Sequence, residues 1–213
     1  SKKVKIKGKI VDYHDVKIYL DEIPFIRLRP ILGNFLMEST ETSLISLVKS
    51  AQEQIEDMLK PIKISINQKA KQLSITGELV NLPAKNLAIY ILLLKLRMTK
   101  YKSDNNEPGY ILTEKLIQED SLFEYLKIYE SMYKSGNTYV ENERAKISNY
   151  KDRQMFFTLK WLQETRSKIN SVLKKSLPPH IFTICQIHSA GVRHSTCYGI
   201  PIHPGNINIT NQG

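Results

Sequence analysis

Residues 82–98 read LPAKNLAIYILLLKLRM and predict a strongly apolar helix. Pro83 would stand near the first turn of this helix, where the missing N–H of proline costs nothing. The apolar run from Leu87 to Leu94 has eight residues, well under the ~18 that a membrane-spanning helix needs. We therefore expect this helix in a protein core, with no membrane span in the chain.

The segments on either side of this helix predict an α+β domain over residues 62–213. Apolar and polar residues alternate between residues 62 and 80, which predicts two or three short antiparallel strands with Thr76-Gly77 as a tight turn. Helices are predicted over 122–133 and 151–176, the second stopped by Pro178-Pro179. Strands over 181–187 and 198–209 would form a final hairpin around Ala190-Gly191.

This order of elements is typical of a winged helix with a leading antiparallel sheet. In that fold the last long helix can enter a major groove, and the final hairpin is the wing. Other small α+β domains share the same order, so the winged helix is a prediction about residues 62–213 that the order alone does not decide.

The N-terminal part of the chain predicts two further regions. In residues 1–32, Val4, Ile6 and Ile10 and then Val16, Ile18 and Leu20 alternate with polar residues, which predicts a β-hairpin with its turn at residues 12–15. Residues 33–61 predict a linker that contains an amphipathic helix over 43–60, stopped by Pro61.

Composition excludes several classes of protein. Of the 213 residues, 41% are hydrophobic and 8% aromatic, which is too many for a disordered chain. Two cysteines cannot form a disulfide framework, and Ser1-Lys2-Lys3 does not lead into an apolar signal segment. These observations make a reducing cytoplasm the expected compartment.

The net charge of +10 is concentrated in two segments. Residues 61–107 carry eight basic and three acidic side chains, and residues 144–175 carry nine basic and two acidic ones. Such an excess is the electrostatic footprint of a nucleic-acid-binding surface. A diffuse, solvated lysine-rich surface would give the same counts.

The predicted helix over 151–176 supplies the candidate nucleic-acid-binding residues. At 100° per residue, Arg153, Lys160, Lys168 and Lys175 fall within an arc of roughly 80°, opposite an apolar face. Arg193 would add a cation at the tip of the final hairpin. The alternative is that these residues form the solvated face of a core helix. Arg166 falls among the apolar residues and is expected to pair with a carboxylate or to extend along the edge of the core.

A zinc site at the final hairpin is suggested by composition but not by spacing. Cys185 and His188 face His194 and Cys197 across the predicted hairpin, and zinc prefers such ligands. Residues three apart in a strand point to opposite faces, so neither pair would converge on a metal. We therefore predict no metal site and no cofactor. Nothing in the chain matches a nucleotide-binding glycine loop or a nucleophile motif, so catalytic residues remain unassigned.

The stretch VKIYLDEIPFIRLR at residues 16–29 resembles a signature of the CRISPR-associated CARF-domain ring nuclease family of type III systems. In that family a similar segment follows a Rossmann-like nucleotide-binding core. The later segments ISI at 64–66, GELVNLP at 77–83, RSKIN at 166–170 and YGIPI at 198–202 follow in a similar order. The resemblance implies that residues 1–32 are the hairpin remnant of a CARF domain and that the chain corresponds to the C-terminal part of the family.

This resemblance also implies a function. The chain would be the regulatory or effector part of an antiviral accessory protein that responds to cyclic oligoadenylate, which is bound and cleaved in the preceding core, and it would act as a homodimer. Arg27 and Arg29 are the candidate ligand contacts, since guanidinium groups suit phosphates. Packing at the domain junction is their alternative role. Two other functions stay open: a winged-helix transcriptional regulator that binds DNA or RNA, and a module for protein contact or dimerisation.

Overall fold

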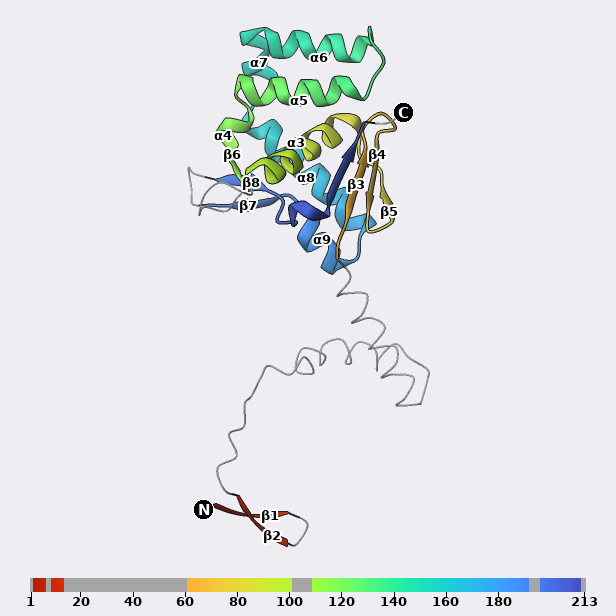
Figure 1. The fold of residues 1–213 in the computed structure, drawn as a ribbon. Helices are drawn as coiled ribbons and strands as arrows, with labels where there is room; N and C mark the ends of the chain where they lie inside the picture. Colours follow the sequence, from red (N-terminus) through yellow and green to blue (C-terminus); the bar gives the residue numbers. More distant parts are fainter. Residues whose placement is uncertain (1, 7–8, 14–60, 101–108, 192–195, 212–213) are drawn as a thin grey trace. The chain divides into compact units, whose positions relative to one another are not determined.

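The computed structural model describes residues 2–6, 9–13, 61–100, 109–191 and 196–211 (Figure 1). The chain divides into two compact units, Ser1–Lys60 and Pro61–Gly213, which we describe separately. Three predictions about the first unit lie outside the described residues: the strand at 16–20, the amphipathic helix at 43–60, and the positions of Arg27 and Arg29.

The described part of the first unit is a two-stranded antiparallel ribbon. Strand β1 (Lys2–Ile6) pairs with β2 (Lys9–Tyr13), and Ile6 lies opposite Lys9 in the register. The predicted turn at residues 12–15 is therefore wrong. Residues 12 and 13, which were expected in the turn, belong to strand β2.

A four-stranded sheet forms one side of the second unit. Its strands are β3 (Ile64–Asn67), β4 (Gln72–Ile75), β5 (Glu78–Val80) and β9 (Ile207–Thr210), in the order β5-β4-β3-β9. The first three strands and the turn at Thr76-Gly77 confirm the prediction, and both turn residues have positive φ angles, of 52° and 92°. Strand β9 pairs in parallel with β3. The prediction that residues 198–209 form one strand of the final hairpin is therefore wrong.

Helix α3 (Ala84–Lys100) is the apolar helix that residues 82–98 predict. Every residue from Leu87 to Leu94 is buried, and Ile64, Ile66, Leu73 and Ile75 of the sheet belong to the same buried core. Each Leu or Ile side chain buried in this way contributes about 1.5–3 kcal/mol relative to an exposed one. Leu79 of β5 is apolar but does not belong to this core, since its side chain is exposed.

Of the six other α-helices that the structure describes, five precede Pro178. They are α4 (Thr113–Leu116), α5 (Glu119–Ser131), α6 (Thr138–Ser148), α7 (Tyr150–Phe156) and α8 (Leu159–Ser176). Helix α5 confirms the predicted helix at 122–133, whereas α6 was not predicted. The prediction of a single helix over 151–176 is wrong, because the helix is interrupted at Phe157 and Thr158. The Thr158 side chain accepts a hydrogen bond from the Trp161 N–H and so caps the start of α8.

Aromatic rings fill the junction between α7 and α8. The centroids of Phe157 and Trp161 are 5.0 Å apart, and Tyr125 of α5 lies 6.4 Å from each of them in an edge-to-face arrangement. Such ring pairs stabilise a core beyond their buried area. Phe157 is buried. The interruption between α7 and α8 therefore directs the Phe157 ring into the core.

Helix α9 (Pro179–Cys185) occupies most of the segment 181–187 that was predicted as a strand. Proline at the first helical positions is already in helical geometry, and Pro179 stands at the start of α9. Ile181 and Cys185, four residues apart, are the buried positions of this helix. The β-branched residues of this segment favoured a strand, but the helix start at Pro179 and the burial of one helical face decided its structure.

A three-stranded sheet completes the second unit. Strands β6 (Ile111–Leu112), β7 (His188–Ala190) and β8 (Cys197–Gly199) pair in the order β6-β8-β7. The antiparallel pairing of β7 with β8 confirms a hairpin after Ala190, and Gly191 has a φ of 90°. A 3₁₀ turn at Pro204–Asn206 then leads into β9. The second unit is thus an α+β fold, and no helix in the described part of the chain is long and apolar enough to cross a membrane.

Gly199 of β8 offers a test of the packing of this strand against the ring of Tyr110, which directly precedes β6. A Cβ atom at Gly199 would lie 2.6 Å from the Tyr110 ring. We expect Gly199→Ala to lower the free energy of unfolding by about 1–3 kcal/mol, because the ring must move. Chemical denaturation measures this loss. Ser189→Ala is the control, since Ser189 is exposed on the neighbouring strand β7, and an equal effect of both changes would contradict the packing.

Candidate nucleic-acid interface

Helix α8 has a buried face and a basic exposed face. Leu162, Thr165, Ile169 and Leu173 are buried. The exposed residues on the opposite side include the predicted Lys160, Lys168 and Lys175, together with Glu164 and Lys174. Lys174 and Lys175 also stand in the last turn, where cations interact favourably with the helix dipole. The structure therefore places three of the predicted cations on one solvent-exposed surface.

Arg153 does not belong to that surface, contrary to the prediction. It lies on α7, and its side chain is only 13% exposed. One guanidinium nitrogen lies 2.9 Å from the Glu119 carboxylate, and another donates a 2.7 Å hydrogen bond to the carbonyl oxygen of Ile147. The break at Phe157 and Thr158 changes the helical phase, and Arg153 instead ties α7 to α5 and α6.

Asn170 fastens the β7–β8 hairpin to α8. Its side-chain amide donates a 3.0 Å hydrogen bond to the Ile187 carbonyl oxygen, and its amide oxygen accepts a 2.8 Å bond from the Ile187 N–H. Ile187 is buried and directly precedes β7. These paired hydrogen bonds fix the point at which the chain leaves α9 and enters the hairpin. Sequence reasoning missed this role, although an asparagine near the buried side of an amphipathic helix is a signal of such a partner.

Arg166 attaches the same hairpin one turn earlier. Its Nε donates a 3.2 Å hydrogen bond to the Ile187 carbonyl oxygen, and its guanidinium lies 5.0 Å from the centroid of the Tyr198 ring on β8. A guanidinium at this distance from an aromatic face is attracted by the ring. The expected carboxylate partner is thus replaced by a carbonyl group and a tyrosine ring, and α8 holds both strands of the hairpin.

A hollow of about 220 Å³ separates the first turns of α8 from the β6–β8 pair. Leu112, Thr113, Glu114, Leu159, Gln163, Thr196 and Tyr198 line it. Gln163 of α8 and Tyr198 of β8 therefore border the same hollow. Arg193, predicted at the hairpin tip, lies outside the described residues.

The cysteine and histidine side chains of this region do not gather into a metal site where the structure describes them. Among those residues, no three His, Cys, Asp or Glu side chains lie close enough to hold a metal ion. Cys185 is fully buried, and burial raises the pKa of its thiol to about 12. A ring nitrogen of His188 lies 2.6 Å from the Thr183 carbonyl oxygen. His194 is outside the described residues.

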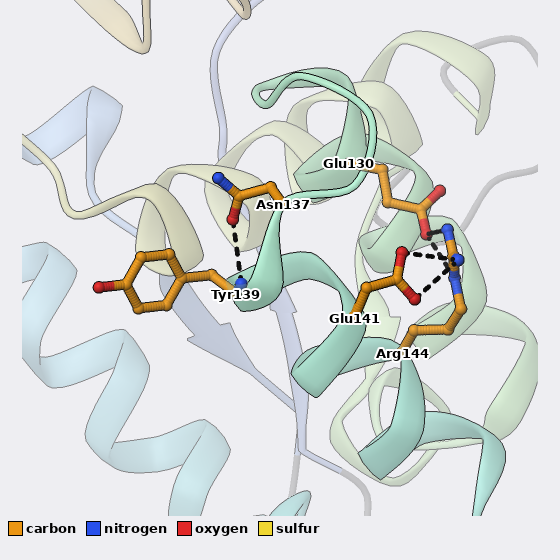
Figure 2. Close-up of polar contacts among 5 residues, drawn as sticks. All are labelled: Glu130, Asn137, Tyr139, Glu141 and Arg144. Atoms are coloured by element: carbon orange, nitrogen blue, oxygen red, sulfur yellow. Dashed lines mark hydrogen bonds and ion pairs between the residues drawn. The ribbon is translucent and has the colours of Figure 1, made fainter.

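Helices α5 and α6 carry a second polar cluster, shown in Figure 2. The Arg144 guanidinium lies between two carboxylates: Nε donates a 3.0 Å bond to Glu130, and Nη1 donates bonds of 3.1 and 3.2 Å to the two oxygens of Glu141. These partners raise the pKa of Arg144. The cluster joins α5 to α6 through Arg144. Because the two carboxylates neutralise the Arg144 cation, α8 is the stronger candidate for binding a polyanion.

The fastening of the hairpin can be tested at Asn170. Asn170→Ala leaves the buried Ile187 N–H without its side-chain acceptor, while the Ile187 carbonyl oxygen keeps its hydrogen bond from Arg166. An unsatisfied buried N–H costs about 1–3 kcal/mol, so we expect the free energy of unfolding to fall by that amount in chemical denaturation. Ser171→Ala on the exposed face is the matched control and should change stability by no more than about 0.5 kcal/mol. Equal stability of the two variants would show that the hydrogen bonds contribute nothing.

No protein-family model, curated protein or solved structure matches this chain. The likeness of residues 16–29 to the CARF-domain ring nuclease family therefore stands on the sequence pattern alone. The geometry of α8 and the β7–β8 hairpin makes this surface the candidate for binding a polyanion.

Proposed function

We propose that residues 61–213 form a winged-helix module that binds duplex nucleic acid through α8 and the β7–β8 hairpin. The order α3, β6, α4, α5, α6, α7, α8, α9, β7, β8 supports this proposal, with α8 as the longest helix before the hairpin and the short α9 between the two. So does the sheet order β6-β8-β7, in which a strand that precedes the middle helices pairs with the last strand of the hairpin. In a winged helix the long helix before the hairpin is the one that enters the major groove.

The charges on α8 support the same proposal. Among the described residues, no carboxylate lies within ion-pairing distance of Lys160, Lys168 or Lys175, so all three ammonium groups are available to phosphates. Glu164 stands between Lys160 and Lys168 on the exposed face. Its negative charge weakens the attraction between this part of the helix and the phosphates of a nucleic acid. Phosphate contacts of this kind position a protein on a duplex.

The attachment of the hairpin to α8 is the observation that carries the proposal furthest. Asn170 and Arg166 bind the backbone at the start of the hairpin, and Arg166 also lies against Tyr198. Helix and hairpin therefore present one preformed surface. A preformed surface loses less conformational entropy on binding than two independent elements would.

The resemblance to the ring nuclease family supplies the biological context of the proposal. In that context the module is the regulatory or effector part of a type III CRISPR accessory protein. Cyclic oligoadenylate bound by the sensing domain, with Arg27 and Arg29 as candidate contacts, would shift the population of states in which the module is held for binding. A transcriptional regulator would use the same duplex-binding surface without the cyclic ligand.

The salt dependence of duplex binding tests the role of the lysines. Three phosphate contacts predict a slope of about −2.7 in a plot of log affinity against log salt, and Lys168→Gln with Lys175→Gln should reduce its magnitude by about 1.8. Fluorescence anisotropy with a labelled duplex measures both slopes. The double change should also weaken binding at low salt, since two cations are lost.

A variant of equal charge controls for general electrostatics. Lys69 and Lys134 are exposed and lie on the β3–β4 turn and after α5, so Lys69→Gln with Lys134→Gln removes the same net charge away from α8. We expect this control to keep most of the original slope. Identical slopes for the two double variants would mean that the duplex does not bind at α8.

Incubation with cyclic tetra-adenylate tests the division of roles that the resemblance implies. We expect no linear products from this chain, because the family's ring cleavage is attributed to the core that precedes the matched segment. Chromatography of the nucleotide separates cyclic from linear forms. The appearance of linear oligoadenylate would show that residues of this chain carry out ring cleavage.

A further inference from the structure

The hollow of about 220 Å³ between the first turns of α8 and the β6–β8 pair has a lining of two kinds. Its apolar walls come from Leu112, Leu159 and Tyr198, and its polar groups come from Thr113, Glu114, Gln163 and Thr196. Pockets for drug-sized ligands measure about 300–1,000 Å³. This hollow is smaller than that range, so it admits a single small ring system.

The polar groups of the hollow are not used within the protein. Among the described residues, the side chains of Glu114, Gln163 and Thr196 make no hydrogen bond and no ion pair. An ionised carboxylate only accepts hydrogen bonds, whereas an amide both donates and accepts them. A ligand that complements Glu114 and Gln163 therefore carries a donor beside an acceptor. The edge of a nucleobase with an exocyclic amino group has this pattern.

The apolar walls match the faces of such a base. Leu159 is 43% exposed although it is a large apolar side chain. Tyr198 is buried, and the Arg166 guanidinium lies 5.0 Å from the centroid of its ring. A base that leaves the stack of a duplex is bound through hydrogen bonds to its edge and through contacts of its faces with aromatic or apolar side chains. The hollow offers both kinds of contact.

The hollow begins where the lysines of α8 begin. Lys160 directly follows Leu159, and Gln163 comes three residues after Lys160 on the same helix. Residues three apart are neighbours on the surface of a helix, and both of these side chains are exposed. A strand with a phosphate on Lys160 therefore brings one of its nucleotides to the hollow.

We propose that this hollow binds one unpaired, amino-bearing base of a nucleic acid held on α8. The inference deepens the proposed function and rests on it, since α8 must first hold the strand. Removing a base from a duplex costs a few kcal/mol of pairing and stacking, which an already unpaired base does not lose. A duplex with one unpaired base is therefore the preferred partner. Thymine carries a carbonyl oxygen where cytosine carries its amino group, and Glu114 repels that oxygen.

Fluorescence anisotropy with three labelled duplexes tests the proposal. One duplex is fully paired, one carries a single unpaired cytosine, and one carries an abasic site in place of that cytosine. We expect the unpaired cytosine to give at least about fivefold tighter binding than either of the others, because its base gains contacts in the hollow. An unpaired thymine in the same place should give a smaller gain.

Two single variants connect this preference to the hollow. Gln163→Ala and, separately, Glu114→Gln should remove most of the preference for the unpaired cytosine. Gln72→Ala is the matched control, also at an exposed glutamine but on β4, and should leave the preference unchanged. The ratio of two affinities is compared, so the general effect of losing the Glu114 charge cancels. Glu114 and Gln163 are exposed, and unchanged thermal midpoints would exclude misfolding.

The outcomes separate this inference from the proposed function. Equal affinity for the three duplexes, with a salt slope that still depends on Lys168 and Lys175, overturns the base site and leaves the duplex-binding surface in place. An abasic site that binds as tightly as the unpaired cytosine also overturns the base site, and so does a preference that survives Gln163→Ala. Absence of binding to any duplex overturns the proposed function and this inference with it.

Discussion

The burial of α3 is the constraint on which the second unit depends. Residues Leu87 to Leu94 are all buried, so this helix has no solvent face along two turns and must be covered on every side. The buried faces of the four-stranded sheet, α5 and α8 belong to the same core, and Figure 1 shows these elements arranged around α3. Tyr90 fits this environment because its hydroxyl donates a 2.8 Å hydrogen bond to the Cys185 carbonyl oxygen, which satisfies its one polar group.

Local periodicity predicted the elements whose partners are near in sequence. The strands between Ile64 and Val80, the turn at Thr76-Gly77 and helix α3 follow from alternation, turn chemistry and a continuous apolar run. Strand β9 could not be assigned this way, because its place beside β3 depends on a pairing across more than half of the chain. The helical state of residues 179–185 was missed because a short apolar segment fits either period, and tertiary burial decided between them.

The candidate site was predicted only in part, for a related reason. Lys160, Lys168 and Lys175 follow from helical spacing, which holds within one uninterrupted helix. Arg153 was assigned wrongly because the interruption at Thr158 resets that spacing. Asn170 was not predicted to hold the hairpin, because its place near the buried side of α8 indicates that it has a hydrogen-bond partner but does not identify that partner as the Ile187 backbone.

The edge-to-face packing of Trp161 with Phe157 and Tyr125 has a spectroscopic consequence. Trp161 is the single tryptophan of the chain, and it lies in the first turn of α8 beside the junction with α7. Its intrinsic fluorescence therefore reports on one place alone, where α7 meets the helix with the basic face. A change in tryptophan emission on adding a duplex would arise from that junction, so the protein carries its own optical probe beside the basic helix.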